Sequence, residues 1–264
     1  QDLKDKELLK AEAIAHHLLG QHERRETFNN LSAELKPTSL EQAYQAQDIF
    51  HKIANRGHLG GYKIALSSKV QQCHHNISSP LIGGIFKEDI FYTKKEVLRK
   101  NYQGLGIEIE LGFQLSDAIC SPKKPVTLEN IKTYIEEVYP VIELVNDRNA
   151  NYEGLDPLSL ICDNAWSGGV VLGENIINWR EVDFSNLHSN LYWNQETKKR
   201  TCVMDAEPFK NLCWLLNTLI NRGKILDSKM IMITGSVFLI RQADSGDIVR
   251  HVLNGGYTAE LKII

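Results

Sequence analysis

Two glutamates, Glu108 and Glu110, are separated by one residue in a stretch that otherwise has the pattern of a β-strand. Successive strand side chains point to opposite faces, so both carboxylates lie on one face, roughly 7 Å apart along the strand. Like charges this close disfavour each other's ionisation unless a cation lies between them. The spacing therefore predicts either a solvated acidic face or two oxygen ligands for one divalent cation.

A third glutamate, Glu143, interrupts the apolar run at 139–145. A buried carboxylate without a partner is costly, so this one must be ion-paired, metal-bound or protonated. One interpretation is a salt bridge, for which Arg148 is a candidate partner. The other is that Glu143 joins Glu108 and Glu110 in a set of oxygen donors suited to Mg²⁺ or Mn²⁺.

Lys63 similarly interrupts an apolar strand pattern at 60–66. Its position alone favours a lysine that reaches solvent at a strand edge. Beside a metal-bound carbonyl group, the same side chain could instead move protons or hold an anionic ligand.

Two turn-forming segments precede or follow strand patterns, and both allow two interpretations. Residues 163–169 (Asp-Asn-Ala-Trp-Ser-Gly-Gly) lead into an apolar strand, and residues 234–236 (Thr-Gly-Ser) end one. Either segment could be an ordinary turn, or it could present backbone N–H groups and hydroxyls to an anion.

The elements that must position these residues indicate an α+β chain. Apolar residues recur at helical spacing over 8–19, and a capping pattern at 38–41 begins a second helix that ends near Gly57. Further helices are expected at 128–138 and 209–221. Strands are expected at 61–66, 106–115, 138–145, 168–172, 187–193, 230–234, 248–253 and 257–263, and the last two flank a hairpin turn.

Bulk composition excludes several classes of protein. The 264 residues are 42% hydrophobic and 24% charged with a formal net charge of −3, so neither a nucleic-acid-binding nor a membrane-binding surface is indicated. A small-molecule ligand or other subunits are the expected partners.

Five cysteines without C-x-x-C spacing indicate free thiols and a cytoplasmic location, although the chain begins at Gln1 and secretion stays open.

Taken in order, these segments resemble the fumarylacetoacetate hydrolase superfamily, in its branch of 2-oxopent-4-enoate (2-hydroxypenta-2,4-dienoate) hydratases and 2-oxo-3-hexenedioate decarboxylases. The similarity extends through nearly the whole chain. The matching blocks are Gly61-Tyr62-Lys63-Ile64, Leu66-Ser67-Ser68-Lys69, Gly84-Ile85-Phe86 with Glu88-Asp89, Glu108-Ile109-Glu110, Pro140-Val141-Ile142-Glu143 with Arg148, Asp163-Asn164-Ala165, Val171-Leu172-Gly173, Thr234-Gly235-Ser236 and Gly246-Asp247.

The resemblance implies a mixed β-sandwich roll at 61–264, preceded by a helical segment at 1–60. It also implies that Glu108, Glu110 and Glu143 hold Mg²⁺ or Mn²⁺, to which a 2-oxo acid binds. Lys63 would donate or shuttle a proton, and Glu88 and Asp89 would position water. Substrate contacts would come from Arg148, Asp163, Ser167 and Ser236.

The implied activity is that of a metal-dependent hydro-lyase that adds water to an unsaturated 2-oxo acid and gives a 4-hydroxy-2-oxo acid. Decarboxylation of a 2-oxo-3-hexenedioate is the alternative reaction, and a non-catalytic partner subunit or binding module is the alternative class. Trp166 and Phe238 are bulkier than the residues that the family pattern has there, so a reshaped pocket is expected. A β-rich chain of this kind is also expected to form a homo-oligomer.

Overall fold

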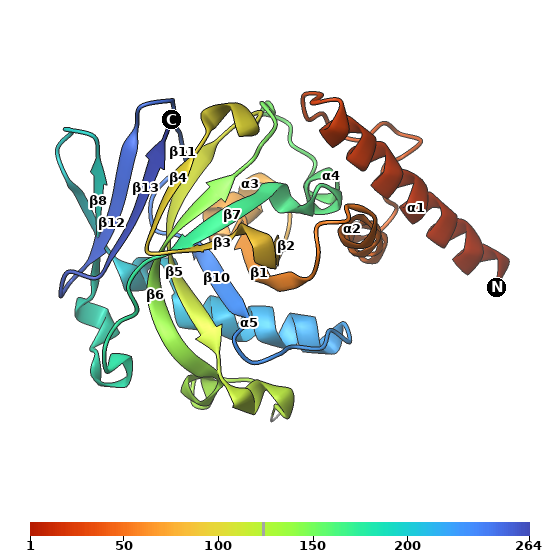
Figure 1. Ribbon diagram of the computed structural model, residues 1–264. Coiled ribbons are helices and arrows are strands. Elements are labelled where there is room, and N and C mark those ends of the chain that lie inside the picture. The colour runs from red at the N-terminus through yellow and green to blue at the C-terminus, as the bar shows by residue number, and fades with distance from the viewer. Residues whose placement is uncertain (123–124) are drawn as a thin grey trace.

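Two β-sheets and five α-helices make up the computed structural model, which describes residues 1–122 and 125–264. The larger sheet is mixed and curls beside the smaller one, and the first two helices lie together at one side (Figure 1). The predicted α+β class and the roll of mixed sheets are confirmed. Within the described residues, no helix is both long and apolar enough to cross a bilayer.

The larger sheet carries most of the residues on which the sequence analysis concentrated. Its strand order is β2-β1-β10-β5-β6-β7-β3, and the short β11 also pairs with β5. The strands are β1 (Leu59–Ala65), β2 (Leu81–Phe86), β3 (Ile90–Tyr92), β5 (Gly106–Leu115), β6 (Ile135–Val145), β7 (Ser167–Leu172), β10 (Ile231–Ser236) and β11 (Arg241–Gln242).

The smaller sheet has the order β4-β13-β12-β8-β9. Its strands are β4 (Lys94–Val97), β8 (His188–Trp193), β9 (Lys199–Cys202), β12 (Ile248–Leu253) and β13 (Thr258–Ile263). The hairpin expected between β12 and β13 is confirmed. Apolar side chains from both sheets, such as Ile109, Ile142 and Leu261, form one buried cluster, which fixes β5 and β6 against the smaller sheet.

The helices are α1 (Asp2–Glu23), α2 (Leu40–Ile53), α3 (Lys69–His74), α4 (Pro157–Cys162) and α5 (Pro208–Asn221). Single 3₁₀ turns occur at Lys87–Asp89, Arg99–Asn101, Asp117–Cys120, Ile131–Tyr134, Asn164–Trp166, Trp179–Glu181, Phe184–Asn186 and Val203–Ala206. The predicted cap of α2 is present, because the Ser39 side chain accepts a hydrogen bond from Gln42 N.

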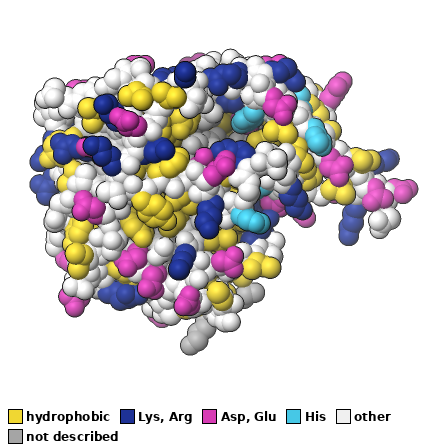
Figure 2. Space-filling model, viewed as in Figure 1, with side chains coloured by type: hydrophobic (Ala, Val, Ile, Leu, Met, Phe, Trp, Pro, Cys, Tyr) yellow, Lys and Arg dark blue, Asp and Glu magenta, His cyan; other side chains and the backbone are white. Residues whose placement is uncertain are grey.

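The N-terminal helices share a hydrophobic core with the larger sheet. Ile14 and Leu18 of α1 and Phe50 of α2 lie in the same buried cluster as Phe113 of β5. The first turns of α1 project from the rest of the protein (Figure 1). Acidic and basic side chains are mixed over the surface that Figure 2 shows. The division of the chain at residue 60 stays a prediction.

The helix expected at 128–138 was wrong. Ile131–Tyr134 forms one 3₁₀ turn, and β6 begins directly afterwards at Ile135. The apolar residues of this stretch suit a helix, but those from Ile135 onward pair with β5 over the full length of that strand. Tertiary pairing therefore decides the local structure here.

Candidate metal centre

The three glutamates of the sequence analysis meet on neighbouring strands. Glu108 and Glu110 lie on β5, and Glu143 lies on β6 directly opposite Glu108. One carboxylate oxygen of each lies within 4.8 Å of the other two. Alternation along β5 turns both glutamates to one face, while Ile107 and Ile109 enter the apolar cluster behind it.

The donor set fits a divalent cation. Glu110 is 1% exposed and Glu143 is 2% exposed. Glu110 Oε2 and Glu143 Oε1 are fully buried, and neither has a hydrogen-bond partner within the described part of the chain. Buried oxygens without partners are costly, and a bound cation would satisfy both.

Electrostatics leads to the same conclusion. Burial and the carboxylate of Glu143 raise the pKa of Glu108 to about 8. Burial and the carboxylates of Glu143 and Glu108 raise the pKa of Glu110 well above its ordinary value. Without a cation, the site therefore resists full ionisation; a divalent ion would reverse that preference.

Lys63 lies at this centre, on β1. Its side chain is 3% exposed, and its Nζ lies 3.2 Å from Glu143 Oε2. The prediction that Lys63 reaches solvent at a strand edge was therefore wrong, because β1 is flanked by β2 and β10. The suggested Glu143–Arg148 pair was also wrong, since Lys63 takes that place.

The segment 234–236 closes the centre from β10. Gly235 N donates a hydrogen bond to Glu110 Oε1 at 2.6 Å. Gly235 has φ +116°, and a Cβ there would lie 2.3 Å from Ser67 Oγ, so only glycine allows this approach. Ser236 follows, and its hydroxyl hydrogen-bonds the backbone of Phe238.

A cavity of about 600 Å³ opens beside the carboxylates. Lys63, Glu108 and Ser236 line it, and Glu110 and Glu143 lie deeper in the protein. The remaining lining is mostly apolar. The volume is in the range of small-molecule sites, which is about 300–1,000 Å³.

Trp166 forms part of the cavity wall and leaves the cavity open. Asn164, Ala165 and Trp166 have φ values of 56°, 49° and 57°, an unusual run for residues other than glycine. The Asn164 side chain holds this turn by hydrogen bonds to Gly84 N and O. The Trp166 ring packs against Phe28 and Tyr152. The bulky residue therefore shapes the pocket without filling it.

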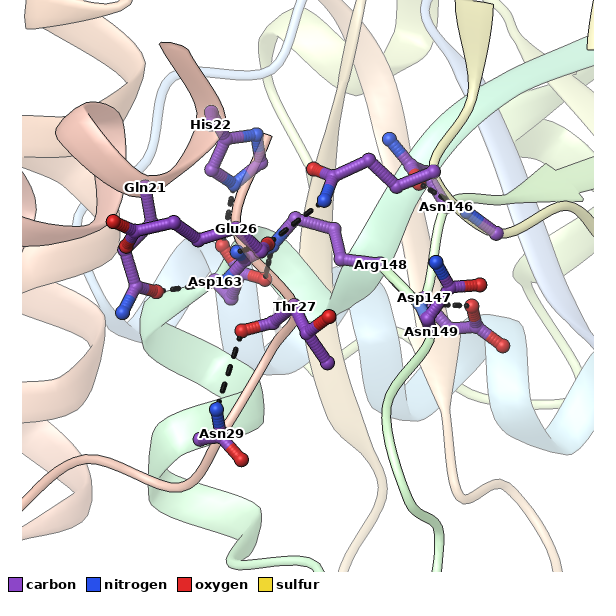
Figure 3. A network of polar contacts seen from close by, with 12 residues as sticks. Gln21, His22, Glu26, Thr27, Asn29, Asn146, Asp147, Arg148, Asn149 and Asp163 are labelled. Atoms are coloured by element: carbon purple, nitrogen blue, oxygen red, sulfur yellow. Dashed lines mark hydrogen bonds and ion pairs between the residues drawn. The ribbon is translucent and has the colours of Figure 1, made fainter. Parts of the chain in front are cut away.

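Arg148 and Asp163 pair with each other rather than with the glutamates. Arg148 is fully buried, its Nε lies 3.0 Å from Asp163 Oδ2, and its Nη1 donates to the carbonyl oxygen of Glu26. His22 Nε2 lies 2.6 Å from the other Asp163 oxygen. Figure 3 shows this network joining the end of α1 to the loop after β6. Neither Arg148 nor Asp163 lines the 600 Å³ cavity.

Glu88, Asp89 and Ser167 also lie away from that cavity. Arg56 pairs with Glu88 at 2.9 Å and with Asp89 at 2.6 Å. Asp89 and Ser167 line a second, smaller cavity together with Asp163. The structure thus brings together Lys63, Ser236 and the three glutamates, and it does not bring the other five predicted residues to them.

Sequence reasoning did not find several residues of the cavity wall. Tyr152, Leu155 and Leu160 come from the loop after β6 and from α4, and His75 and Val70 lie in or beside α3. The Tyr152 hydroxyl donates to Asp147 Oδ2 at 2.7 Å. None of these residues stands in a motif, so no signal in the sequence marked them.

Comparison with known proteins agrees with this geometry. The 2-oxo-hept-4-ene-1,7-dioate hydratase of Escherichia coli is 29% identical over 89% of this chain and 90% of its own length. A 2-keto-4-pentenoate hydratase of Paraburkholderia xenovorans is 25% identical over 88% and 84%. A 4-oxalocrotonate decarboxylase of Pseudomonas putida is 21% identical over 89% of each. The chain is thus similar in sequence to these hydratases and decarboxylases over most of its length. No family model matches it.

Solved structures confirm the fold that the sequence resemblance implied. The 4-oxalocrotonate decarboxylase of Pseudomonas putida G7, complexed with magnesium and adipate, superposes with a TM-score of 0.86 at 20% identity, covering 96% of this chain and 97% of that one. A fumarylacetoacetate hydrolase family protein of Yersinia pestis gives a TM-score of 0.52 at 16% identity, covering 70% and 85%. The fold of this chain is that of the decarboxylase structure, and the Yersinia pestis protein shares part of it.

Proposed function

We propose that this chain is a divalent-metal-dependent hydro-lyase that adds water to an unsaturated 2-oxo acid of the 2-oxopent-4-enoate type. The product is a 4-hydroxy-2-oxo acid. One observation carries the proposal: three glutamate carboxylates, two with buried oxygens that lack partners, meet beside a buried lysine at the wall of an open cavity. The hydratase relatives support the same reaction.

Glu108, Glu110 and Glu143 would hold Mg²⁺ or Mn²⁺, since all three offer hard oxygen donors. The magnesium complex of the decarboxylase neighbour supports Mg²⁺. When bound, the cation would supply Lewis-acid polarisation of the carbonyl group of the substrate.

Lys63 would place a positive charge and a proton donor beside the reacting chain. A 2-hydroxydienoate must lose its enol proton and gain one on carbon to become an unsaturated 2-oxo acid. Lys63 Nζ is the cationic group of the cavity wall that can transfer this proton. Glu143, 3.2 Å away, fixes the position of the ammonium group.

Ser236 and the loop around Gly235 would bind the acid end of the substrate. Ser236 lines the cavity, and the backbone at Gly235 is held against Glu110. Water would then add at C4 of the unsaturated acid. The roles proposed for Glu88 and Asp89 in placing that water, and for Arg148, Asp163 and Ser167 in substrate binding, stay predictions from the sequence resemblance.

A decarboxylase is the second candidate, because the 4-oxalocrotonate decarboxylase structure matches nearly the whole fold with a TM-score of 0.86. The deciding experiment incubates the purified protein and Mg²⁺ separately with 2-hydroxypenta-2,4-dienoate and with 2-oxo-3-hexenedioate. Formation of 4-hydroxy-2-oxopentanoate is the expected result. Release of CO₂ without any hydrated product would assign the decarboxylase reaction, and no turnover of either compound would favour a non-catalytic binding role.

We further propose a homo-oligomeric enzyme in the cytoplasm. The five cysteines are free, which supports a reducing compartment. Light scattering of the purified protein would give its mass in solution, and a monomer would contradict the oligomer.

A further inference from the structure

We infer that the cavity selects a 2-oxo acid with a neutral, apolar tail and disfavours one with a second carboxylate. The inference rests on the proposed function, which places the acid end of the substrate at the three-glutamate centre. It concerns the rest of the cavity, into which the tail must extend.

Apolar side chains from four separate segments form most of the cavity wall. Val70 comes from α3, Leu155 and Leu160 from the region of α4, Trp166 from the turn before β7, and Phe238 and Leu239 from the loop after β10. Val70 is 79% exposed and Leu239 is 92% exposed, so apolar surface continues out to the solvent-facing part of the wall. Such a surface is stabilised by contact with apolar tail atoms.

Cations that could pair with a distal carboxylate are scarce. Among the described residues that line the cavity, Lys63 is the one lysine or arginine, and it already pairs with Glu143. His75 also lines the wall and is the other side chain that could carry a positive charge.

Two hydroxyl groups of the wall, those of Ser68 and Tyr152, already donate hydrogen bonds within the protein. Gln71 N donates to Ser68 Oγ and Ser68 N donates to Gln71 Oε1, which together form the capping box of α3, and Ser68 Oγ also donates to Gln71 Oε1. The Tyr152 hydroxyl donates to Asp147 Oδ2 at 2.7 Å. A carboxylate entering this region would lose its water without gaining a lysine or arginine partner of its own.

The cavity is also large enough to hold a substrate with a tail beyond its acid end. At about 600 Å³, the cavity is much larger than a five-carbon 2-oxo acid requires. The Escherichia coli relative is named for a 1,7-dioate. We therefore expect the present chain to prefer a different substrate from that relative.

Two saturated six-carbon acids test the inference by calorimetric titration in Mg²⁺ at pH 8, where a histidine side chain is ordinarily neutral. In 2-oxoadipate a carboxylate replaces the terminal methyl group of 2-oxohexanoate, and the acid ends are identical. We expect 2-oxohexanoate to bind at least about tenfold more tightly. Equal binding, or tighter binding of 2-oxoadipate, would overturn the inference and leave the proposed function intact. Failure of both acids to bind would overturn the proposed function itself.

Leu239→Lys supplies the missing cation at an exposed position where the fold does not depend on the side chain. This variant should reduce the preference for 2-oxohexanoate at least threefold, whereas Leu239→Gln, the uncharged control, should not. An unchanged preference in Leu239→Lys would count against an electrostatic origin of the selectivity.

Discussion

Lys63 Nζ lies 3.2 Å from Glu143 Oε2, although two strands, β10 and β5, separate their strands in the sheet. Three strand spacings amount to roughly 14 Å, so the two side chains meet above the intervening strands. Glu108 and Glu110 project from one of those strands, β5. The ion pair thus spans the sheet at the point where the other two carboxylates emerge.

Replacing Lys63 by methionine should destabilise the metal-free protein by about 3 kcal/mol, because Glu143 would be left as a buried charge without its partner. Urea unfolding in EDTA measures this loss. The double variant Lys63→Met/Glu143→Gln should recover most of it. If the loss of unfolding free energy in the double variant equals the sum of the losses in the two single variants, the two side chains are not coupled.

The same Lys63→Met variant should lose about 10²–10⁴-fold in turnover if Lys63 transfers the proton. Binding of Mg²⁺ should persist, since the three carboxylates remain. Turnover within threefold of the wild type, measured on folded protein, would remove Lys63 from the reaction.

Glu110→Gln should abolish Mg²⁺ binding and cost the metal-free protein little stability. The amide oxygen can still accept the hydrogen bond from Gly235 N, and the raised pKa of Glu110 already disfavours its charged form in the metal-free protein. Calorimetry with Mg²⁺ measures binding, and thermal unfolding measures stability. Glu136→Gln, an exposed glutamate on β6, is the matched control and should bind like the wild type. Unimpaired binding by Glu110→Gln would show that the cation lies elsewhere.

Arg148→Met should lower the free energy of unfolding by about 3 kcal/mol and leave the KM of the folded enzyme nearly unchanged. The reason is that Arg148 is fully buried, pairs with Asp163 and supports the end of α1. Arg24→Met, which breaks the exposed pair with Glu26, is the control and should change stability far less. A tenfold rise in KM without loss of stability would instead support the substrate contact that the family resemblance implies.

Stability should fall between pH 6.5 and pH 4 because of His251. Burial lowers the pKa of this residue to about 4, and its ring nitrogens bond the carbonyl of Val141 and the hydroxyl of Ser189. Below pH 6.5 the histidine is protonated in the unfolded chain but stays neutral in the folded protein. The free energy of unfolding therefore falls by up to about 3 kcal/mol between pH 6.5 and pH 4, and His251 causes no further loss below pH 4. Urea unfolding at several pH values measures this slope. His251→Asn should flatten it, whereas His58→Asn, at an exposed position, should not; equal slopes in both variants would contradict the assignment.

The meeting of the three glutamates could be predicted from sequence because it depends on local rules. Strand alternation places Glu108 and Glu110 on one face, and an apolar run marks Glu143 as a charge that needs a partner. Which cation pairs with Glu143 could not be predicted, because the choice between Lys63 and Arg148 depends on strand order. The position of the Trp166 ring, which packs against Phe28 and Tyr152, could not be predicted, because the left-handed backbone at this residue has no signature in the sequence.

Proton NMR of the reaction with 2-hydroxypenta-2,4-dienoate tests whether hydration depends on a metal at the three-glutamate centre. The samples are the wild type in Mg²⁺, the wild type in EDTA, and Glu110→Gln in Mg²⁺. We expect signals of 4-hydroxy-2-oxopentanoate from the wild type in Mg²⁺ and from neither of the other two samples. Equal product formation in EDTA, or undiminished formation by Glu110→Gln, would contradict a metal-dependent reaction at the three-glutamate centre.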